Sequence, residues 1–354
     1  MRSRYLCLLL GLVVMTIVSI TTVAYDRTET FRFENIHSIN IETISGNIKI
    51  CPGDESKLIV ELINNLDEPE LLDPELEADD GELFIEEDFI GRNVRGETHW
   101  KIYLPKSASL RSIKCNSASG DMIFEEFKAD YITTESASGK MSVNSVGAKE
   151  LELSSASGAI VLEDCRADFI EAESASGKIS VNSLSTKELN LSTASGKIAA
   201  EDCEADFIKA SSASGRISVS SLRATELKLS NASGRIVVED GEIDEMGKAS
   251  SASGDVELFL PQLPTRLEAS SASGDVDLKV VEFGENFTMT LMKRADKGRI
   301  KCPFEYTEKE TIRLHKNDRY LTDRYLVERG KGGPDIKLST ASGTIKIETD
   351  TKGK

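Results

Sequence analysis

Hydrophobic and polar residues alternate with a period of two along most of this chain. In the stretch 188–201, Leu189 and Leu191 alternate with polar residues, and Ile198 and Ala200 follow the same spacing after a Ser-Gly pair. A period of two sends successive side chains to opposite faces, so each such segment is predicted to be a β-strand with one buried face. The Ser-Gly pair between two segments is typical of a tight corner.

This strand, corner, strand unit recurs at a fixed interval. The sequence Ala-Ser-Gly ends at Gly120, Gly139, Gly158, Gly177, Gly196, Gly215, Gly234, Gly254, Gly274 and Gly343. The first six intervals in residue number are all 19, and the next two are 20. Such constant spacing indicates one structural coil per repeat. We therefore predict an all-β fold, a single-stranded parallel β-solenoid (β-helix) with 19–20-residue rungs and atypical capping ends.

The corner residues are expected to be structural. Glycine would supply backbone angles that other residues reach only with strain. The serines before the glycines, from Ser138 to Ser273, would stack at rung spacing and form hydrogen bonds along the stack. No histidine or lysine recurs beside them at a spacing that would activate a nucleophile. We therefore expect a structural ladder rather than a row of catalytic or ligand-binding serines.

A second, 38-residue period lies on the first, because units of the type DFIEAESASG alternate with KELNLSTASG. A 38-residue rung would make Cys165 and Cys203 neighbours, whereas a 19-residue rung separates them by about 9.6 Å, too far for a disulfide. We favour the 19-residue rung, because one apolar column then contains Phe127, Val146, Cys165, Leu184, Cys203 and Leu222. Both thiols should then be buried and reduced.

The same alternation places an aromatic residue in every second unit. These residues are Tyr131, Phe169 and Phe207, and the other units carry Glu150, Glu188 and Glu226 at this position. Strand parity, counted from the inward Ile170 and Ala172, points the column outward. An aromatic column flanked by carboxylates is a candidate binding surface for carbohydrate or a partner protein. Alternatively, the chain bends at this corner and the rings cover the core.

Composition narrows the class of partner. The chain has 354 residues, of which 60 are acidic and 43 basic, and its formal net charge is -17. Binding to nucleic acid or an anionic membrane needs a basic face, so both are disfavoured. Hydrophobic residues make up 39% and charged residues 29%, which indicates a folded body rather than a disordered chain.

Residues 1–24 have the organisation of an export signal. Arg2 and Arg4 precede the apolar run 6–20, and the small residues 22–24 follow as a cleavage site. The alternative is an uncleaved anchor, because the apolar run is almost long enough to span a bilayer. In both cases the body is expected to be exported, to the extracellular medium or the outer face of the cell envelope. Membrane contact is expected only through residues 1–24, if they are retained.

The remaining cysteines do not suggest a disulfide framework or a metal site. They are Cys51, Cys115, Cys165, Cys203 and Cys302. Their number is odd and their spacing wide, and no C-x-x-C pair occurs. We expect no metal and no cofactor.

Some acidic residues also recur with the repeat, and they are the candidates for catalytic carboxylates. Asp164 and Asp202, beside Glu163 and Glu201, repeat at the 38-residue period. An active site usually interrupts a repeat once, whereas these carboxylates follow the scaffold. The calcium-binding nonapeptide of some β-helices is absent. We expect no enzyme activity, the alternative being an enzyme that acts on polysaccharides.

The two ends depart from the regular stride. Residues 31–50 contain one similar unit around Gly46, and residues 332–347 (GGPDIKLSTASGTIKI) restore a clean final rung after an irregular stretch. The expected organisation is an export segment (1–24), an N-terminal β segment and cap (25–110), regular repeats (111–281), irregular rungs with the closing rung (282–348) and a tail (349–354). Open terminal rungs expose unpaired backbone, so both ends are expected to act as caps.

The serial SASGD and SASGK turns, the opening IETISGNIKI and the closing GGPDIKLSTASGTIKI resemble the bacterial “putative adhesin” β-repeat family, the domain of unknown function 4097. The resemblance covers roughly residues 30–348. It implies an exported β-helix with an adhesin-like role, and it transfers no catalytic residues. Some relatives accompany regulators of cell-envelope stress.

Together these observations predict an exported, non-catalytic surface protein that acts as an adhesin-like binding module or scaffold. Its expected partner is a surface glycan or an envelope protein. A sensor or regulatory partner in envelope stress is the alternative, and a polysaccharide-active enzyme is a third possibility.

Overall fold

The computed structural model describes residues 20–23, 26–91, 94–106, 108–314 and 320–349. They form β-strands and one short 3-10 helix, η1 (Pro69–Leu71), so the all-β prediction is confirmed. The chain divides into a first unit that ends at Phe169 and a second unit that begins at Ile170. The boundary falls inside the regular repeats, within strand β15 (Arg166–Ser174). Most of the predicted export segment lies outside the described residues.

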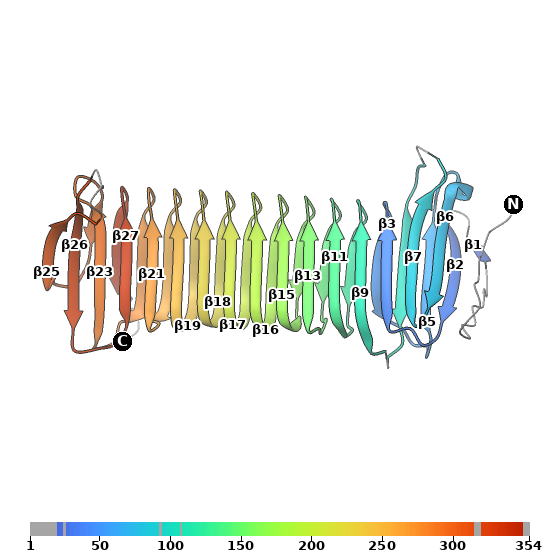
Figure 1. Cartoon of the computed structure of the whole chain (residues 1–354), viewed down its shortest axis with the longest axis horizontal. Coiled ribbons are helices and arrows are strands. Elements are labelled where there is room, and N and C mark those ends of the chain that lie inside the picture. The colour runs from blue at the N-terminus through green and yellow to red at the C-terminus, as the bar shows by residue number, and fades with distance from the viewer. Residues whose placement is uncertain (1–19, 24–25, 92–93, 107, 315–319, 350–354) are drawn as a thin grey trace. The chain divides into compact units, whose positions relative to one another are not determined.

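All the described strands belong to one hydrogen-bonded network. In the first unit they form two stacks of parallel strands, here called sheets, to which each coil contributes one strand (Figure 1). One sheet contains β3 (Ser38–Thr43), β9 (Leu110–Ser117), β11 (Ala129–Ser136) and β13 (Glu150–Ser155). The other contains β4 (Asn47–Pro52), β10 (Met122–Glu125), β12 (Met141–Asn144) and β14 (Ile160–Glu163). Met141 lies opposite both Met122 and Ile160, so neighbouring strands have an offset of 19 in residue number.

The N-terminal part of this unit does not follow chain order. After β4 the chain forms β5 (Leu58–Asn64), β6 (Leu72–Asp79), β7 (Glu82–Phe89) and β8 (Thr98–Leu104). β7 and β8 pair in parallel with β3 and β4, on the sides away from β9 and β10. β1 (Ile20–Val23), β2 (Asp26–Phe33), β5 and β6 add antiparallel pairs. The opening coil therefore lies between two later segments of the chain.

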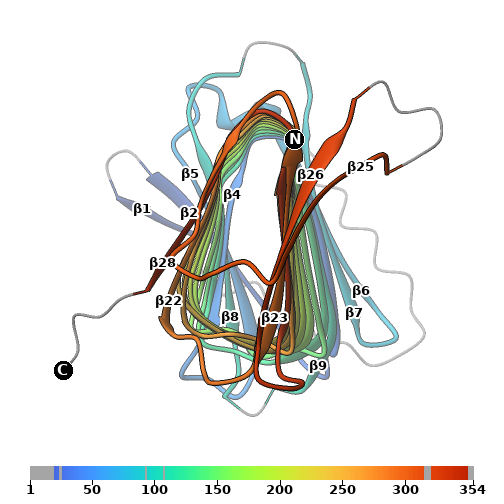
Figure 2. The same cartoon turned by 90° about the vertical axis from the view of Figure 1, so that its left-hand side faces the viewer.

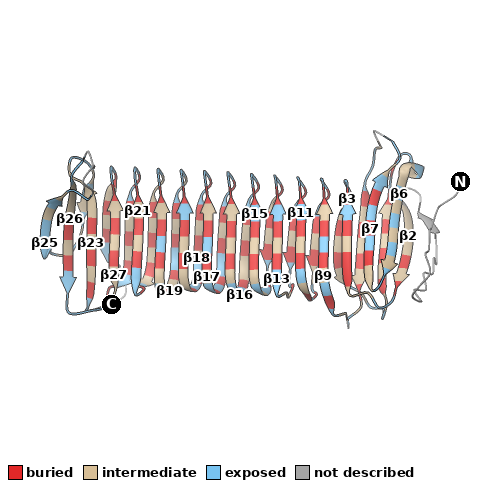
Figure 3. Ribbon diagram, in the orientation of Figure 1, coloured by how far each residue is buried: buried red, intermediate tan, exposed pale blue. Residues whose placement is uncertain are grey.

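The regular coils of the second unit have longer strands that continue around a bend. They are β16 (Ile179–Thr193), β17 (Ile198–Ser212), β18 (Ile217–Asn231) and β19 (Ile236–Ser251). Buried and solvent-facing residues alternate along them (Figure 3). Ile198 lies opposite Ile179 and Ile217, an offset of 19, and Ile236 lies opposite Val256, an offset of 20. β20 (Val256–Gln262), β21 (Arg266–Ser271) and β22 (Val276–Glu282) continue the stack.

The C-terminal part of the second unit also leaves chain order. β27 (Asp335–Thr340) and β28 (Thr344–Thr349) pair directly with β21 and β22. β23 (Phe287–Arg294) and β24 (Arg299–Lys301) pair with their other sides. The closing rung of the sequence is therefore not the last in space, and the irregular coil around Gly298 lies beyond it. β25 (Glu308–Ile312) and β26 (Thr322–Arg329) pair with each other and extend away from β22 and β28 (Figure 2).

The predicted apolar column lies in the core of both units. All six side chains are at most 8% exposed: Phe127, Val146 and Cys165 in the first unit, and Leu184, Cys203 and Leu222 in the second. Cys165 and Cys203 are free thiols, as predicted. Burial raises the pKa of the Cys203 thiol to about 11 and that of Cys165 in the same direction. Neither thiol is therefore a reactive nucleophile at neutral pH.

The corner glycines are required by close approach rather than by backbone angle. A Cβ on Gly139 would overlap the carbonyl oxygen of Gly120, and one on Gly215 would overlap that of Gly196. None of the described glycines of this ladder has a positive φ. The expectation based on glycine angles was therefore wrong, because what excludes a side chain is the neighbouring coil.

The hydroxyl that organises each corner is also not the expected one. The Gly139 N–H donates to Oγ of Ser136, three residues earlier, at 2.8 Å, and the same contact joins Gly215 to Ser212. Ser136 and Ser212 are buried. The exposed Ser138 continues the ladder mainly through its backbone, whose N–H donates to the Ala118 carbonyl at 3.2 Å. Each of these corners is thus held by two kinds of hydrogen bond, one to a buried hydroxyl and one to the main chain of the preceding coil.

From Glu126 to Asp240, the second corner of each successive coil has a left-handed residue. Asp164 has φ 52° in the first unit, and Asp202 has φ 49° in the second. Ser145 and Ser183 occupy the same corner with φ 55°. Aspartate tolerates this conformation better than most residues. The recurrence of these two carboxylates thus has a backbone explanation.

Candidate functional site

Tyr131 is the most exposed member of the predicted aromatic column. Its ring lies on the outer face of β11 and is 44% exposed, whereas the adjacent Ile132 is buried. Glu150 of β13 lies opposite it on one side and Ser112 of β9 on the other. The ring therefore faces solvent with a carboxylate beside it.

Phe169 is half-buried at the end of the first unit. Its backbone N–H donates to the carbonyl of Lys149 at 3.0 Å. The next residue along the chain, Ile170, is fully buried. Strand parity thus turns the Phe169 ring to the outer side, as for Tyr131.

Phe207 lies on β17 in the second unit, between Glu188 of β16 and Glu226 of β18. Its ring is half-buried, because Nζ of Lys228 lies 4.6 Å from the ring centroid. Lys228 also forms an ion pair with Glu226 at 3.1 Å. The ring is thus partly covered by a cation that a ligand would have to displace or share.

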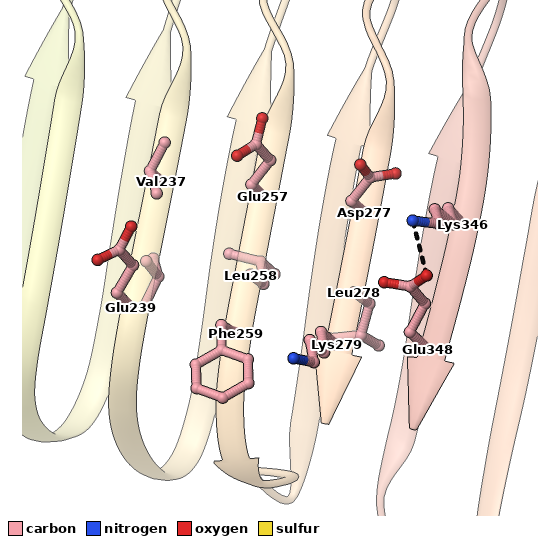
Figure 4. A pocket seen from close by; sticks show the side chains of 11 residues that line it. Val237, Glu239, Glu257, Leu258, Phe259, Asp277, Leu278, Lys279, Lys346 and Glu348 are labelled. Carbon is pink, nitrogen blue, oxygen red and sulfur yellow. Dashed lines mark ion pairs between the residues drawn. The ribbon is translucent and has the colours of Figure 1, made fainter. Parts of the chain in front are cut away.

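A second candidate was not predicted from the sequence. It is a groove of about 200 Å³ on the second unit, lined by strands β19, β20, β22 and β28 (Figure 4). We name it the outer groove. Its solvent-facing residues form two rows across these strands: Val237, Glu257, Asp277 and Lys346 in one, and Glu239, Phe259, Lys279 and Glu348 in the other.

Side chains of both charges line the outer groove. Lys346 donates to Glu348 at 2.7 Å, which raises the lysine pKa. Nζ of Lys279 lies 4.8 Å from the centroid of the Phe259 ring. Asp277 lies opposite Lys346, and burial raises the pKa of its carboxyl group. The groove thus combines an aromatic ring with hydrogen-bond donors and acceptors.

The sequence did not predict the outer groove, because all units of the repeat were taken to carry the same kinds of outward residue. Earlier coils of the second unit carry small residues at the positions that continue the first row, namely Ser180, Ala199 and Ser218. The residues of this row change from small or apolar to charged where the repeat lengthens from 19 to 20 residues, after Gly234. Comparing outward positions between the shorter and the longer units would have revealed it.

Two further chemical possibilities can be addressed within the described residues. In that part of the chain, no three His, Cys, Asp or Glu side chains are grouped so that they could hold a metal ion. The same residues include no helix of the length and hydrophobicity needed to cross a membrane.

The family model Toastrack DUF4097 matches residues 36–168 and 163–348. No curated protein matches this chain. Among solved structures, a “putative lipid binding protein” from Parabacteroides distasonis is 24% identical over 65% of this chain and 94% of its own, with a TM-score of 0.47. A “putative adhesin” from Parabacteroides merdae is 12% identical over 73% and 93%, with a TM-score of 0.44. One from Bacteroides fragilis is 16% identical over 92% and 98%, with a TM-score of 0.32.

Proposed function

The chain belongs to the Toastrack family, and we propose that it acts as an exported, non-catalytic surface protein, an adhesin-like binding module or scaffold. The observation that carries this proposal is the exposed ring of Tyr131 on the outer face of a sheet. An aromatic ring held on a stacked β-scaffold offers apolar contact area with little conformational freedom to lose on binding.

The charges around the aromatic column define the kind of partner. Glu150 lies beside Tyr131, and Glu188 and Glu226 lie on either side of Phe207. Carboxylates next to a contact surface repel anions and attract cations. A neutral or cationic surface is therefore the expected partner, such as a neutral glycan or a basic region of an envelope protein.

The proposed scaffold has one coil for every repeat unit of the sequence and a cap at each end. The register offsets of 19 between β10 and β12 and of 20 between β19 and β20 support this assignment. A buried carboxylate at the opening corner supports the capping role of the N-terminal segment, because Glu87 accepts the backbone N–H of Gly46 at 2.9 Å.

Export can be tested separately from binding. If residues 1–24 are a cleaved signal, the protein recovered outside the cytoplasm should begin near Tyr25, and N-terminal sequencing will report this. A chain recovered in the cytoplasm with Met1 intact would refute export.

The binding role is tested by replacing Tyr131, Phe169 and Phe207 with serine together. We expect attachment of the purified chain to bacterial or host-cell surfaces to fall, while the melting temperature changes little because the rings lie on the outer side. The matched control replaces the outward residues two positions along the same strands, Thr133, Glu171 and Lys209, with serine. It should leave attachment unchanged.

Two results would count against this proposal. Unchanged attachment in the aromatic variant would show that the column is not the contact surface. A large fall in melting temperature would show that the rings stabilise the fold at the bend, which is the alternative interpretation of the column.

A further inference from the structure

We propose that the outer groove is a binding site for an uncharged oligosaccharide. The proposal deepens the proposed function, on which it rests, by naming a ligand class and a second contact site. The groove lies on the other side of the bend in these strands from Phe207, because Phe207 lies in the last part of β17, whereas Phe259 lies on β20 beside the first part of β19.

The first argument is that the outward residues of the groove differ from those of the regular coils that precede it in the second unit. In the first row, Ser180, Ala199, Ser218 and Val237 follow one another on successive strands, and Glu257, Asp277 and Lys346 then replace small or apolar residues. The scaffold does not require this change, because the neighbouring inward residues Val256, Leu258 and Leu278 remain buried as in the other coils. The outward residues thus change over an unchanged core, and the charged residues of this row continue to Lys301 of β24.

The second argument is the chemistry of the lining. A sugar hydroxyl both donates and accepts hydrogen bonds, so it is best matched where donors and acceptors alternate over short distances. The groove places donors beside acceptors, since Asp277 lies beside Lys346 in one row, and Lys279 lies between Phe259 and Glu348 in the other. The Phe259 ring adds a flat apolar surface for the face of a sugar ring, which a ligand would share with Lys279, whose Nζ lies 4.8 Å from the ring centroid.

The dimensions of the lining agree with such a ligand. Neighbouring strands are about 4.8 Å apart, and outward residues on one strand are about 6.7 Å apart. Each set of four neighbouring side chains therefore frames an area comparable to one sugar ring. The groove, of about 200 Å³, has room for one sugar ring, and the rest of a chain would lie along the outward residues of the neighbouring strands.

The third argument is charge, which selects an uncharged ligand. The groove contains four carboxylates, Glu239, Glu257, Asp277 and Glu348, and two lysines, Lys279 and Lys346. Uronic acids or phosphates would be repelled by the carboxylates, which outnumber the lysines. Polyamines would meet carboxylates that already have cations beside them, because Glu348 binds Lys346 at 2.7 Å and Glu257 binds Arg235 at 3.4 Å. Neutral hydroxylated ligands avoid both penalties.

The experiment is isothermal titration of the full chain with defined hexasaccharides. The neutral probes are cellohexaose, maltohexaose and xylohexaose, the anionic probe is hexagalacturonate, and the cationic probe is chitosan hexamer. The groove variants are Phe259→Ala and the isosteric Asp277→Asn. The control is Ser218→Ala, which lies in the same column on β18 but outside the groove. Thermal melting of each variant verifies folding.

We expect at least one neutral hexasaccharide to bind the native chain, and each groove variant to weaken it about tenfold. Ser218→Ala should bind as the native chain does. Failure of all neutral probes to bind, indifference of the bound probe to both groove variants, or preference for the charged probes would each overturn the groove assignment.

The cell-attachment assay separates this inference from the proposed function. If the native chain attaches to cells but binds no neutral hexasaccharide, the groove assignment fails and the binding function stands. If it binds a hexasaccharide through the groove but attaches to no surface, the adhesin-like role fails and the groove assignment stands.

Discussion

The backbone N–H of Gly46 donates to Oε2 of Glu87 at 2.9 Å. The same oxygen accepts the N–H groups of Ile44 at 3.0 Å and Ser45 at 2.9 Å. In later corners of the first unit the counterparts of the Ile44 and Ser45 N–H groups bond to carbonyls of the preceding coil, as Ser138 does to Ala118, and the glycine N–H bonds to the hydroxyl three residues earlier. Glu87, on the neighbouring strand β7, therefore accepts the N–H groups of this corner in place of a neighbouring corner's carbonyls, and the buried Gly46 N–H is not left unpaired.

We predict that Glu87→Ala lowers the free energy of unfolding by about 3 kcal/mol, because a charge-assisted acceptor is lost and buried donors remain. Glu87→Gln keeps an acceptor oxygen and should lose about half as much. Urea titration measures both. The adjacent exposed Glu86→Ala is the control and should stay within about 0.5 kcal/mol of the native chain. Equal losses for Glu86→Ala and Glu87→Ala would contradict the capping role.

The corner glycines lead to a second prediction. Gly139→Ala would place a Cβ against the carbonyl oxygen of Gly120, and backbone atoms cannot move aside as a flexible side chain can. We expect a loss of about 2–3 kcal/mol, as for other overpacked sites. Ala137→Ser, at an exposed position of the same corner, should change stability by less than about 0.5 kcal/mol. Comparable melting temperatures for the two variants would show that neighbouring coils can separate more easily than the structure indicates.

The strands and their stacking could be predicted because both have local sequence signals. Alternation of apolar and polar residues marks a strand, and equal spacing of Ala-Ser-Gly marks the coil. The order of the terminal coils has no such signal. Gly343 stacks on Gly274, and Gly298, which comes between them in the sequence, stacks beyond Gly343. A repeat unit shows that a coil forms, but it does not show which neighbour the coil will meet.

The aromatic column and the outer groove could be predicted only in part, because some of their contacts are made between coils. Strand parity correctly turned Tyr131 outward, because its neighbour Ile132 must face the core. Parity could not show that Lys228 would lie over the ring of Phe207, since this contact is made between two coils. The outer groove depends on four strands of which β28 comes from a distant segment, so Asp277 and Lys346 meet only after the chain has returned.

The core thiols give a third prediction. Cys165 and Cys203 are buried, and burial raises the pKa of both, so the native chain should react slowly with a thiol reagent at pH 8. Denaturation in urea should expose them, and mass spectrometry of labelled peptides will identify each. Rapid labelling of either residue in the native chain would show that its coil opens locally.

The last prediction concerns an ion pair that links β26 to β23 in the second unit. Nζ of Lys293 donates to Asp323 at 2.8 Å, and the lysine side chain is only 11% exposed. Thr311 donates its hydroxyl to the same carboxylate at 2.7 Å. These contacts, with the bond to Lys293 the largest effect, lower the pKa of Asp323 below its usual value.

A lowered carboxyl pKa in the folded state stabilises the protein above the unfolded pKa of about 3.9 and loses that contribution as pH falls through the folded value. We therefore expect Asp323→Asn to reduce stability by about 1 kcal/mol at pH 7, a figure discounted for solvent screening. The difference between native and variant melting temperatures should shrink below about pH 4. Asp335→Asn, which affects an exposed pair with Lys337, should change little at any pH. A difference between native chain and Asp323→Asn that stays constant from pH 7 to pH 3 would mean that Asp323 acts through packing rather than charge.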